Sequence, residues 1–477
     1  MRLVKNMFYV TVFQLLNIIV PLITTPYISR VLGPEGVGIN AYTLSITTYF
    51  VLAGSLGIQL YGNREIAYYQ GNKEKKSQIF FELVILKVIA ISLSTIIYLI
   101  FSIFQGNYTN YFLIQGFALL AAALDISWYF MGVENFRILV IRNTVIKVIV
   151  LGLTFILVKQ EADLWIYILL TAASPVLGNL TVWPFLRTEL VKVRLKSLNM
   201  IRHLKPALLL FLPQITMSIY LSLNKTMLGV MVDIKSAGYY SQSDMIIRSA
   251  FTLVSSFAGA FLPRLSSLFS EEKYEEIKNL TLKSFDLSIF LSVLIMSGIM
   301  AISNKFAVVF FGERFEIVGA LMSVQSLMIL FVSFAVVSGS QYLLAAKRTK
   351  EYAISAVLGL IVNVLFNFIL IPFLGAMGAI ISTVLTEFIV AVYQLWVIRD
   401  VFSIREILRG VWKYLVGGTI VFVVVHTLSI NMPGKFIYFV VQALVGVLIY
   451  ISVILLLKAS IISEMKGILL LKKDRGN

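Results

Sequence analysis

Long uncharged stretches, each followed by a short polar segment, recur along the whole chain. Near the N-terminus, an apolar stretch over residues 6–30 leads into segment 31–38, which holds three glycines and a proline, and a second apolar stretch covers residues 39–61. About 20 apolar residues suffice for a helix to cross a bilayer, and closely spaced Gly and Pro mark a tight turn. The pattern therefore predicts a transmembrane helical hairpin at the front of the chain.

Twelve further stretches of similar length follow this hairpin. The predicted spans cover residues 6–30, 39–61, 78–104, 110–131, 138–158, 164–186, 206–230, 237–262, 285–309, 317–344, 352–372, 377–398, 414–430 and 436–457. The predicted fold class is therefore an all-α polytopic membrane protein with about 14 transmembrane helices.

Composition supports this class and narrows the chemistry. The 477 residues are 59% hydrophobic and 13% charged, whereas soluble domains are about a quarter charged. The first stretch is too long for the core of a signal peptide and lacks a small-residue cleavage site, so we expect it to remain in the mature protein. The chain has no Cys and two His, which argues against zinc and iron–sulfur sites, and we expect His203 and His426 to be structural. It contains no P-loop motif.

The net charge of +16 has a topological explanation. About 29 of the 40 Lys and Arg lie in the segments that share a side with the two termini, and about six lie on the other side. By the positive-inside rule, both termini are predicted to be cytoplasmic. Because the basic residues sit in alternate short loops, the charge gives no reason to expect nucleic acid as a partner.

The chain also shows a weak internal repeat. Residues 187–205 form a long basic loop after the sixth predicted span, and a string ending Ala237-Gly238-Tyr239-Tyr240 echoes Val37-Gly38 up to Tyr42. We therefore predict an N-lobe over residues 1–205 and a C-lobe over 206–400. The lobes would be related by a pseudo-twofold axis along the membrane normal, with a helix pair and basic tail over 401–477.

Several short sequence motifs follow one another in a characteristic order along the chain. The turn from Arg30 to Gly38 precedes Asn63-Arg64-Glu65-Ile66-Ala67, and residues 124–136, 338–347 and 363–379 follow. Over residues 1–400, these strings resemble the polysaccharide-exporter (Wzx-type) branch of the multidrug/oligosaccharidyl-lipid/polysaccharide flippase superfamily. The sequence departs from that family at Asn224-Lys225, where many relatives carry an acidic residue before the basic one; this argues against a family-wide ion-coupling role there.

The resemblance implies a flippase and no enzymatic activity. Its implied substrate is an undecaprenyl-diphosphate-linked oligosaccharide repeat unit, moved across the bacterial cytoplasmic membrane for capsule, O-antigen or exopolysaccharide assembly by alternating access of a cationic central cavity. The implied partners are this polyprenyl-diphosphate-linked oligosaccharide, membrane lipids, and a polysaccharide polymerase with its chain-length machinery. No cofactor is implied, and coupling to H⁺ or Na⁺ stays open.

Charged residues inside predicted spans are the candidate functional residues, because a charge is costly in a bilayer unless it faces protein or water. The basic set, expected to bind a diphosphate through charge-assisted hydrogen bonds, is Arg30, Lys87, Arg142, Lys147, Lys225 and Arg248. The acidic set, expected to bind the coupling ion, is Asp125, Asp244 and Glu387. No metal site is expected.

These residues also have structural explanations. Those near a span end could extend their side chains to the membrane surface; they are Arg30, Arg142 and Lys225. Nearer the middle of a span, the alternative is a buried ion pair, as for Asp244 and Arg248, which are spaced i,i+4 on one helix face.

Three other functions remain open. One is a flippase for a different polyprenyl-linked cell-wall precursor, and another is a cation-coupled exporter of cationic drugs, which should present unpaired carboxylates and aromatic faces. The third is a membrane-embedded glycosyltransferase or polymerase. The third is disfavoured because no loop exceeds about twenty residues.

Overall fold

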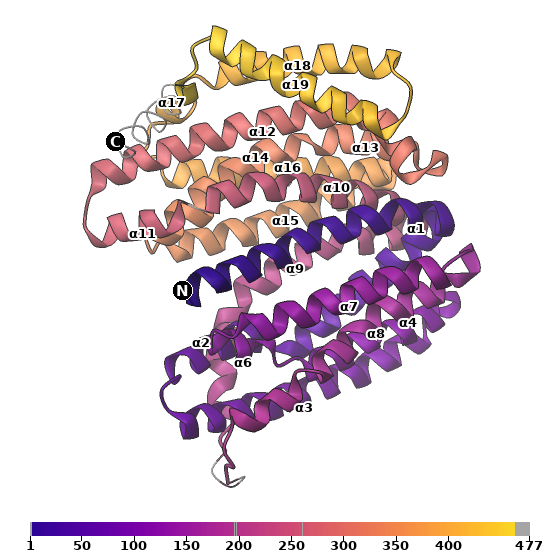
Figure 1. The fold of residues 1–477 in the computed structure, drawn as a ribbon, viewed down its shortest axis with the longest axis vertical. Coiled ribbons are helices and arrows are strands. Elements are labelled where there is room, and N and C mark those ends of the chain that lie inside the picture. Colours follow the sequence, from indigo (N-terminus) through magenta and orange to yellow (C-terminus); the bar gives the residue numbers. More distant parts are fainter. Residues whose placement is uncertain (1, 195, 197, 260, 463–477) are drawn as a thin grey trace. The chain divides into compact units, whose positions relative to one another are not determined.

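The computed structural model describes residues 2–194, 196, 198–259 and 261–462, and this part of the chain contains helices and connecting segments but no strand. The predicted all-α class is thereby confirmed. The chain forms two compact units, Met1–Gly238 (unit 1) and Tyr239–Asn477 (unit 2). Unit 1 is coloured indigo to magenta in Figure 1, and unit 2 continues to yellow. The predicted division into an N-lobe (1–205), a C-lobe (206–400) and an appended helix pair with its tail (401–477) stays a prediction.

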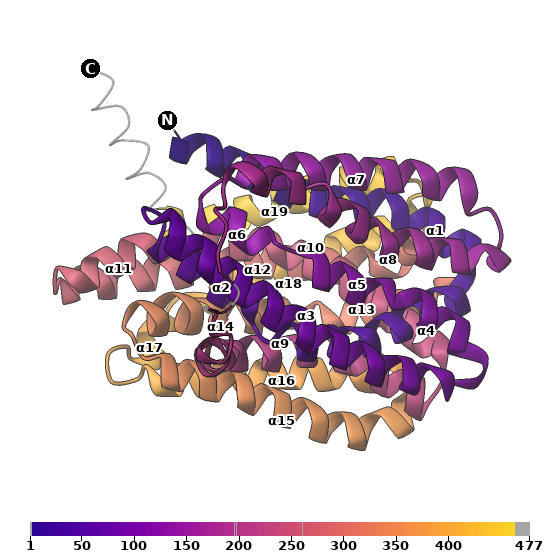
Figure 2. The ribbon, with the colours of Figure 1, turned by 90° about the horizontal axis from the view of Figure 1, so that it is seen from below.

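Unit 1 is built mainly from long helices joined by short 3₁₀ turns. Its elements are α1 (Arg2–Ser55), α2 (Ile58–Tyr68), α3 (Lys73–Ile103), η1 (Gly106–Tyr108), α4 (Thr109–Gln115), α5 (Phe117–Leu124), α6 (Ser127–Gly132), α7 (Phe136–Leu157), η2 (Glu161–Asp163), α8 (Leu164–Leu180), η3 (Trp183–Thr188), η5 (Ile201–His203) and α9 (Leu204–Met231). Figure 2 shows α7 and α8 running side by side, in agreement with their contacts.

Unit 2 has a similar composition of elements. They are α10 (Ile234–Gly259), whose first turn belongs to unit 1, α11 (Leu262–Ser270), α12 (Tyr274–Phe311), η6 (Glu313–Phe315), α13 (Ile317–Gln325), α14 (Leu327–Ala335), the π-helix η7 (Val336–Leu343), α15 (Thr349–Leu374), α16 (Ala376–Val397), α17 (Ile404–Ile407), α18 (Val411–Asn431) and α19 (Phe436–Leu456).

Within the described residues, eleven segments are long and apolar enough to cross a membrane. The segment Ile18–Tyr68 contains the second predicted span and residues 18–30 of the first, and the other ten segments each correspond to one predicted span. The two predicted spans over residues 206–230 and 237–262 coincide with α9 and α10, helices of 28 and 26 residues. A many-span helical membrane protein is therefore what the sequence encodes, while the count of fourteen stays a prediction.

The predicted first hairpin is present within α1. Helical geometry is interrupted at Gly33, whose φ of 65° and ψ of −179° reverse the chain. On one side of this break, the Tyr27 hydroxyl donates to the carbonyl of Val158 at the end of α7 (2.6 Å). On the other side, Thr47 bonds Tyr98 (2.9 Å) and Ser94 donates to the carbonyl of Phe50 (2.7 Å). Because later residues of α1 meet earlier residues of α3, these two helices run in opposite directions.

In unit 1, the second and fourth predicted spans are broken inside the structure. The second breaks at Leu56 and Gly57, both at positive φ (48° and 70°), so that α2 starts in a new direction. The fourth is divided into α4, α5 and α6, with its sharper break at Asp125 and Ile126. Hydropathy does not report such breaks, because the broken and the continuous helix have the same apolar composition.

The core of unit 1 lies around α2, α3 and α6. Phe80 of α3 stacks on Trp128 of α6 with ring centroids 5.6 Å apart, and both side chains are buried. Gly62 of α2 lies against the same indole, where a Cβ would come within 2.5 Å of it. The broken second and fourth spans therefore pack directly on each other.

The two turns that echo each other in the sequence meet in unit 1. A Cβ on Gly38 would lie 1.9 Å from the carbonyl oxygen of Ile234, and a Cβ on Gly238 would lie 2.5 Å from that of Pro34. The contact is reciprocal, since Pro34 and Ile234 hold corresponding places four residues before the two glycines. The two backbones can approach this closely because neither residue has a side chain.

Candidate functional site

Three of the predicted site residues come together in unit 1, at the break between α5 and α6. Lys87 reaches the break from α3, Asp125 forms it, and Arg142 approaches from α7. The Asp125 carboxylate interacts electrostatically with both cations. The sequence identified these residues singly as intramembrane charges, and the structure joins them into one cluster.

Lys87 serves the broken helix directly. Its side chain is buried at 4% exposure, and its ammonium donates to the backbone carbonyl of Asp125 at 2.7 Å. The last carbonyls of any helix lack intrahelical partners and carry a partial negative charge, so a cation there is stabilising. Asp125 Oδ1 accepts from the backbone N–H of Ser127, the first residue of α6 (2.9 Å).

Two further side chains complete the same break. Asn179 of α8 donates to the carbonyl of Ala121 (2.7 Å), and the Trp183 indole donates to that of Leu124 (3.0 Å). Arg142 binds this arrangement from α7, since its guanidinium donates to Asn179 Oδ1 at 3.0 Å. A polar centre inside an apolar bundle thus satisfies the carbonyls that the break in the helix leaves open.

The other basic candidates of unit 1 lie apart from this cluster. Lys147 is one and a half turns beyond Arg142 on α7 and is half-buried. Arg30 lies just before the Gly33 break and is exposed. Lys225 of α9 is half-buried beside the buried Asn224, and the next residue, Thr226, bonds Ser45 of α1 at 2.8 Å. The predicted basic set therefore spreads over several heights of unit 1.

In unit 2, the predicted pair on α10 is a true ion pair. Arg248 Nε donates to both carboxylate oxygens of Asp244, at 2.8 and 2.9 Å. Asp244 also accepts from Gln325 Nε2 (3.0 Å), and Gln325 Oε1 accepts from Ser243 (2.6 Å). The carboxylate is almost fully buried while the arginine side chain keeps 32% exposure. The i,i+4 contact expected from the sequence is therefore present, while the role of the pair stays a prediction.

Glu387, the third acidic candidate, lies on α16 and is half-buried. One turn before it, the Thr383 hydroxyl contacts the hydroxyl of Tyr240 on α10 at 3.3 Å. This contact connects the helix of Glu387 with the helix that carries Asp244 and Arg248.

Sequence reasoning missed three charged residues inside predicted spans. Glu82 of α3 is completely buried and lies in a network with His203. Asp286 of α12 accepts from Tyr414 and Ser460, each at 2.8 Å. Lys305 of the same helix donates to three carbonyls at the end of α18. The i,i+4 polar pair formed by Gln78 and Glu82 at a span entrance was the available signal for the first of them.

A bundle of membrane-length helices whose interior holds charged and polar clusters is the architecture of a membrane transporter. The match to the family described as "Polysaccharide biosynthesis protein" covers residues 3–269, more than half of the chain, and the chain belongs to that family. This membership confirms the resemblance to the polysaccharide-exporter branch, and a transporter, not an enzyme, is what the family and fold indicate.

Three similar proteins illustrate the relationship. The "Putative O-antigen transporter" of Escherichia coli (strain K12) is 24% identical over 405 residues, which cover 83% of this chain and 96% of that protein. The "Capsular polysaccharide biosynthesis protein CapF" of Staphylococcus aureus is 22% identical, covering 84% of this chain and 100% of that protein. Among solved structures, "Lipid II flippase MurJ, inward closed conformation" superposes with a TM-score of 0.75 at 15% identity, over 94% of this chain and 98% of MurJ, and so shares the fold.

Proposed function

We propose that this protein flips a lipid-linked oligosaccharide, built on a polyprenyl diphosphate, across the bacterial cytoplasmic membrane for the assembly of a surface polysaccharide. The observation that carries the proposal is the family match over residues 3–269. It is supported by relatives whose names assign them to O-antigen transport and capsular polysaccharide biosynthesis, and by a fold shared with a lipid flippase. Both termini are proposed to be cytoplasmic, following the distribution of basic residues.

The diphosphate is proposed to bind basic residues in a cationic cavity that opens alternately to the two sides. Lys147 and Arg248 are the principal candidates, since both are half-buried and both lie well inside their helices. Arg248 Nε donates to both carboxylate oxygens of Asp244, and a guanidinium fork matches the geometry of a phosphate. Arg30, Arg142 and Lys225 are the further candidates for contacts with the headgroup.

The test removes these charges one at a time. Losing a charged hydrogen bond costs roughly 1.5–3 kcal/mol, or ten- to a hundred-fold in apparent affinity. Lys147→Ala is therefore expected to abolish surface polysaccharide and leave lipid-linked repeat units in the inner leaflet. Arg248→Ala would also leave the buried Asp244 without its guanidinium, so the variant of choice is the double substitution Arg248→Ala with Asp244→Asn.

Controls distinguish loss of binding from loss of protein. Lys75→Ala changes an exposed lysine at the start of α3 and should keep normal polysaccharide. Arg248→Lys keeps a charge but loses the fork, and partial activity is expected. Normal polysaccharide in both Lys147→Ala and the double variant would contradict the cationic cavity. If the variants accumulate a peptidoglycan precursor instead, the alternative flippase for a cell-wall precursor is favoured. If only their resistance to cationic dyes changes and the polysaccharide is normal, the drug exporter is favoured.

A further inference from the structure

The segment between η3 and α9 is attached to unit 1 at several points. Lys73 donates to the carbonyl of Thr188 (3.0 Å), and the backbone N–H of Val191 donates to Ser77 Oγ (3.0 Å). Lys76 pairs with Glu189 at 3.4 Å. We call the described residues from Glu189 to His203 the linker. Its first residues, up to Val191, therefore lie along the first turns of α3.

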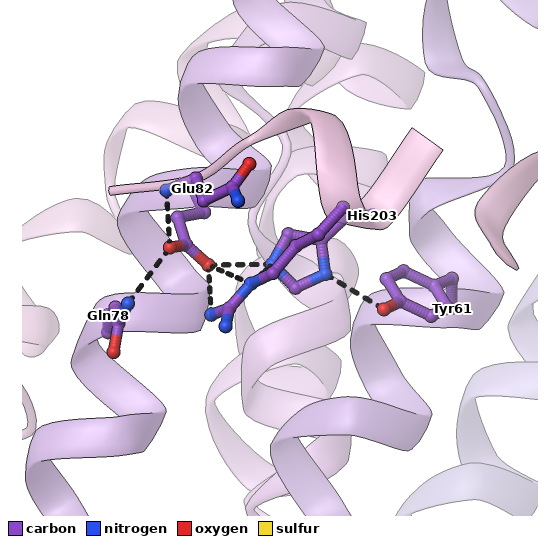
Figure 3. Close-up of polar contacts among 6 residues, drawn as sticks. Tyr61, Gln78, Glu82 and His203 are labelled. Atoms are coloured by element: carbon purple, nitrogen blue, oxygen red, sulfur yellow. Dashed lines mark hydrogen bonds and ion pairs between the residues drawn. The ribbon is translucent and has the colours of Figure 1, made fainter. Parts of the chain in front are cut away.

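The second half of the linker converges on Glu82 (Figure 3). Glu82 Oε1 accepts from the backbone N–H of Asn199 at 2.8 Å and from Gln78 Nε2 at 3.0 Å. Its other oxygen, Oε2, accepts from Arg202 at 3.1 Å (Nε) and 2.5 Å (Nη2), and from His203 Nε2 at 2.7 Å. Four of these five donors belong to the linker, and the carboxylate is 0% exposed.

This arrangement favours the ionised carboxylate and ties it to one linker conformation. A buried carboxylate is stable only when paired and hydrogen-bonded, and here a partly exposed guanidinium supplies the compensating charge. Since an ionised carboxylate only accepts, His203 carries a proton on Nε2. On its far side, His203 Nδ1 contacts the Tyr61 hydroxyl of α2 at 2.8 Å (Figure 3). The linker is thereby joined to α2 as well as to α3.

The network ends where α9 begins, because His203 immediately precedes Leu204. The first turns of α9 also press on the break between α1 and α2: a Cβ on Gly57 would lie 2.5 Å from Phe211 Cβ and 3.1 Å from the carbonyl oxygen of Ala207. Two contacts at different heights thus fix the start of α9 against α2.

We infer that Glu82 is a positioning residue for transport, a latch that holds the linker on α2 and α3 and so sets where α9 starts. Lys225, one of the proposed substrate residues, lies on the same helix about 20 residues further on. A shift at the start of α9 could reach Lys225 because one continuous helix connects the two places. The transport part of this inference rests on the proposed function, whereas the latch itself does not.

The first measurement tests the latch without any substrate. Glu82→Gln replaces one accepting oxygen by an NH₂ group that faces donors, so the linker should open more often. The Asn199 amide is then expected to exchange with deuterium roughly ten- to a hundred-fold faster, with earlier tryptic cleavage after Arg202. The matched control is Glu65→Gln, the same change at a partly exposed carboxylate of α2 that forms a surface salt bridge with its neighbour Arg64 at 3.3 Å.

The second measurement connects the latch with transport of lipid-linked oligosaccharide in proteoliposomes. Turnover should fall at least several-fold in Glu82→Gln at unchanged half-saturating substrate concentration, and Glu82→Asp should restore part of it. If Glu82→Gln fails to accumulate, Arg202→Lys gives the same two measurements with smaller changes. If the Asn199 amide of these variants exchanges with deuterium as slowly as in the unmodified protein, the latch is contradicted. If the amide exchanges faster but turnover is normal, the role of the latch in transport is contradicted. Absence of transport by the unmodified protein would instead count against the proposed function and leave the exchange result valid.

Discussion

Two lysines within membrane-length helices, Lys87 and Lys305, bind the open ends of neighbouring helices. Lys87 donates to the Asp125 carbonyl where α5 ends, and Lys305 donates to the carbonyls of Ser429, Ile430 and Met432 where α18 ends, at 2.5–2.9 Å. Within a bilayer, water cannot satisfy such carbonyls, so an ammonium from a neighbouring helix takes its place. A charge inside a span is therefore not by itself evidence of a substrate site, and each candidate has to be judged by what it contacts.

Lys87→Met tests this structural role at the residue scale. The substitution keeps most of the side-chain volume but leaves the buried Asp125 carbonyl without its donor, at a cost of about 1–3 kcal/mol. We expect a lower thermal unfolding temperature of the detergent-solubilised protein and less protein in the membrane. Lys75→Met on the same helix, at an exposed site, should leave both unchanged. Normal stability combined with lost transport would instead place Lys87 among the substrate-binding residues.

The contacts of individual charges were predictable only where both partners are local. The Asp244–Arg248 pair follows from its i,i+4 spacing. The network of Glu82 could not be predicted from the sequence, because Asn199, Arg202 and His203, which supply its donors, lie about 120 residues away. The partner of Lys87 is a backbone carbonyl, and nothing in the residue types marks a carbonyl as available until the break in the helix is known.

At the scale of elements, hydropathy predicted the helices well and their interruptions poorly. Each apolar stretch within the described residues became helical, because only helices satisfy their own backbone in a bilayer. The breaks at Gly57, at Asp125 and in the π-helix Val336–Leu343 were not foreseen. These breaks depend on packing between spans: Gly57 contacts Phe211, and Gly339 contacts the Gln394 amide. The hydropathy pattern of a single sequence does not contain this information.

The crossing of Gly38 and Gly238 gives a prediction at this scale. Alanine at residue 238 would place its Cβ 2.5 Å from the carbonyl oxygen of Pro34, a backbone atom that cannot rotate away. Overpacking of this kind costs about 1–3 kcal/mol, and Gly238→Ala is expected to lower the unfolding temperature and the amount of folded protein. Because the contact is reciprocal, Gly38→Ala should have an equal or larger effect.

A matched control lies on α7. Gly152 has no atom near the place of a Cβ, so Gly152→Ala should be neutral or stabilising by up to about 1 kcal/mol through helix propensity. Equal stability of Gly238→Ala and Gly152→Ala would show that the two turns do not cross as described. Destabilisation by Gly38→Ala and Gly238→Ala alike would support the internal repeat suggested by the two echoing strings.

At the scale of the whole molecule, the two ends of unit 1 can be distinguished by contacts alone. Tyr42, beyond the Gly33 turn, lies edge-on to Tyr108 (6.1 Å between ring centroids), and Tyr27 bonds the end of α7. The Gly33 turn, η1 and the loop after α7 thus share one end. The linker, α2 and the start of α3 share the other end, where Lys73 binds Thr188 and Lys76 binds Glu189 of the linker.

The absence of cysteine makes the orientation of these ends directly measurable, because single cysteines can be introduced without background labelling. The distribution of basic residues predicts that the linker end is cytoplasmic. Cysteines at the exposed residues Asn107, Gln160 and Glu313 should therefore react with a membrane-impermeant maleimide in intact cells, and cysteines at Glu74 and Ser403 should react only after permeabilisation. Two other outcomes have different meanings, and both can be read in unit 1, which contains Asn107, Gln160 and Glu74. If Glu74 reacts in intact cells while Asn107 and Gln160 do not, the orientation is the reverse of the predicted one and the fold is unaffected. If Asn107 and Glu74 react from the same side, α3 is not a membrane span, because these residues lie just beyond its C-terminal end and at its N-terminal start.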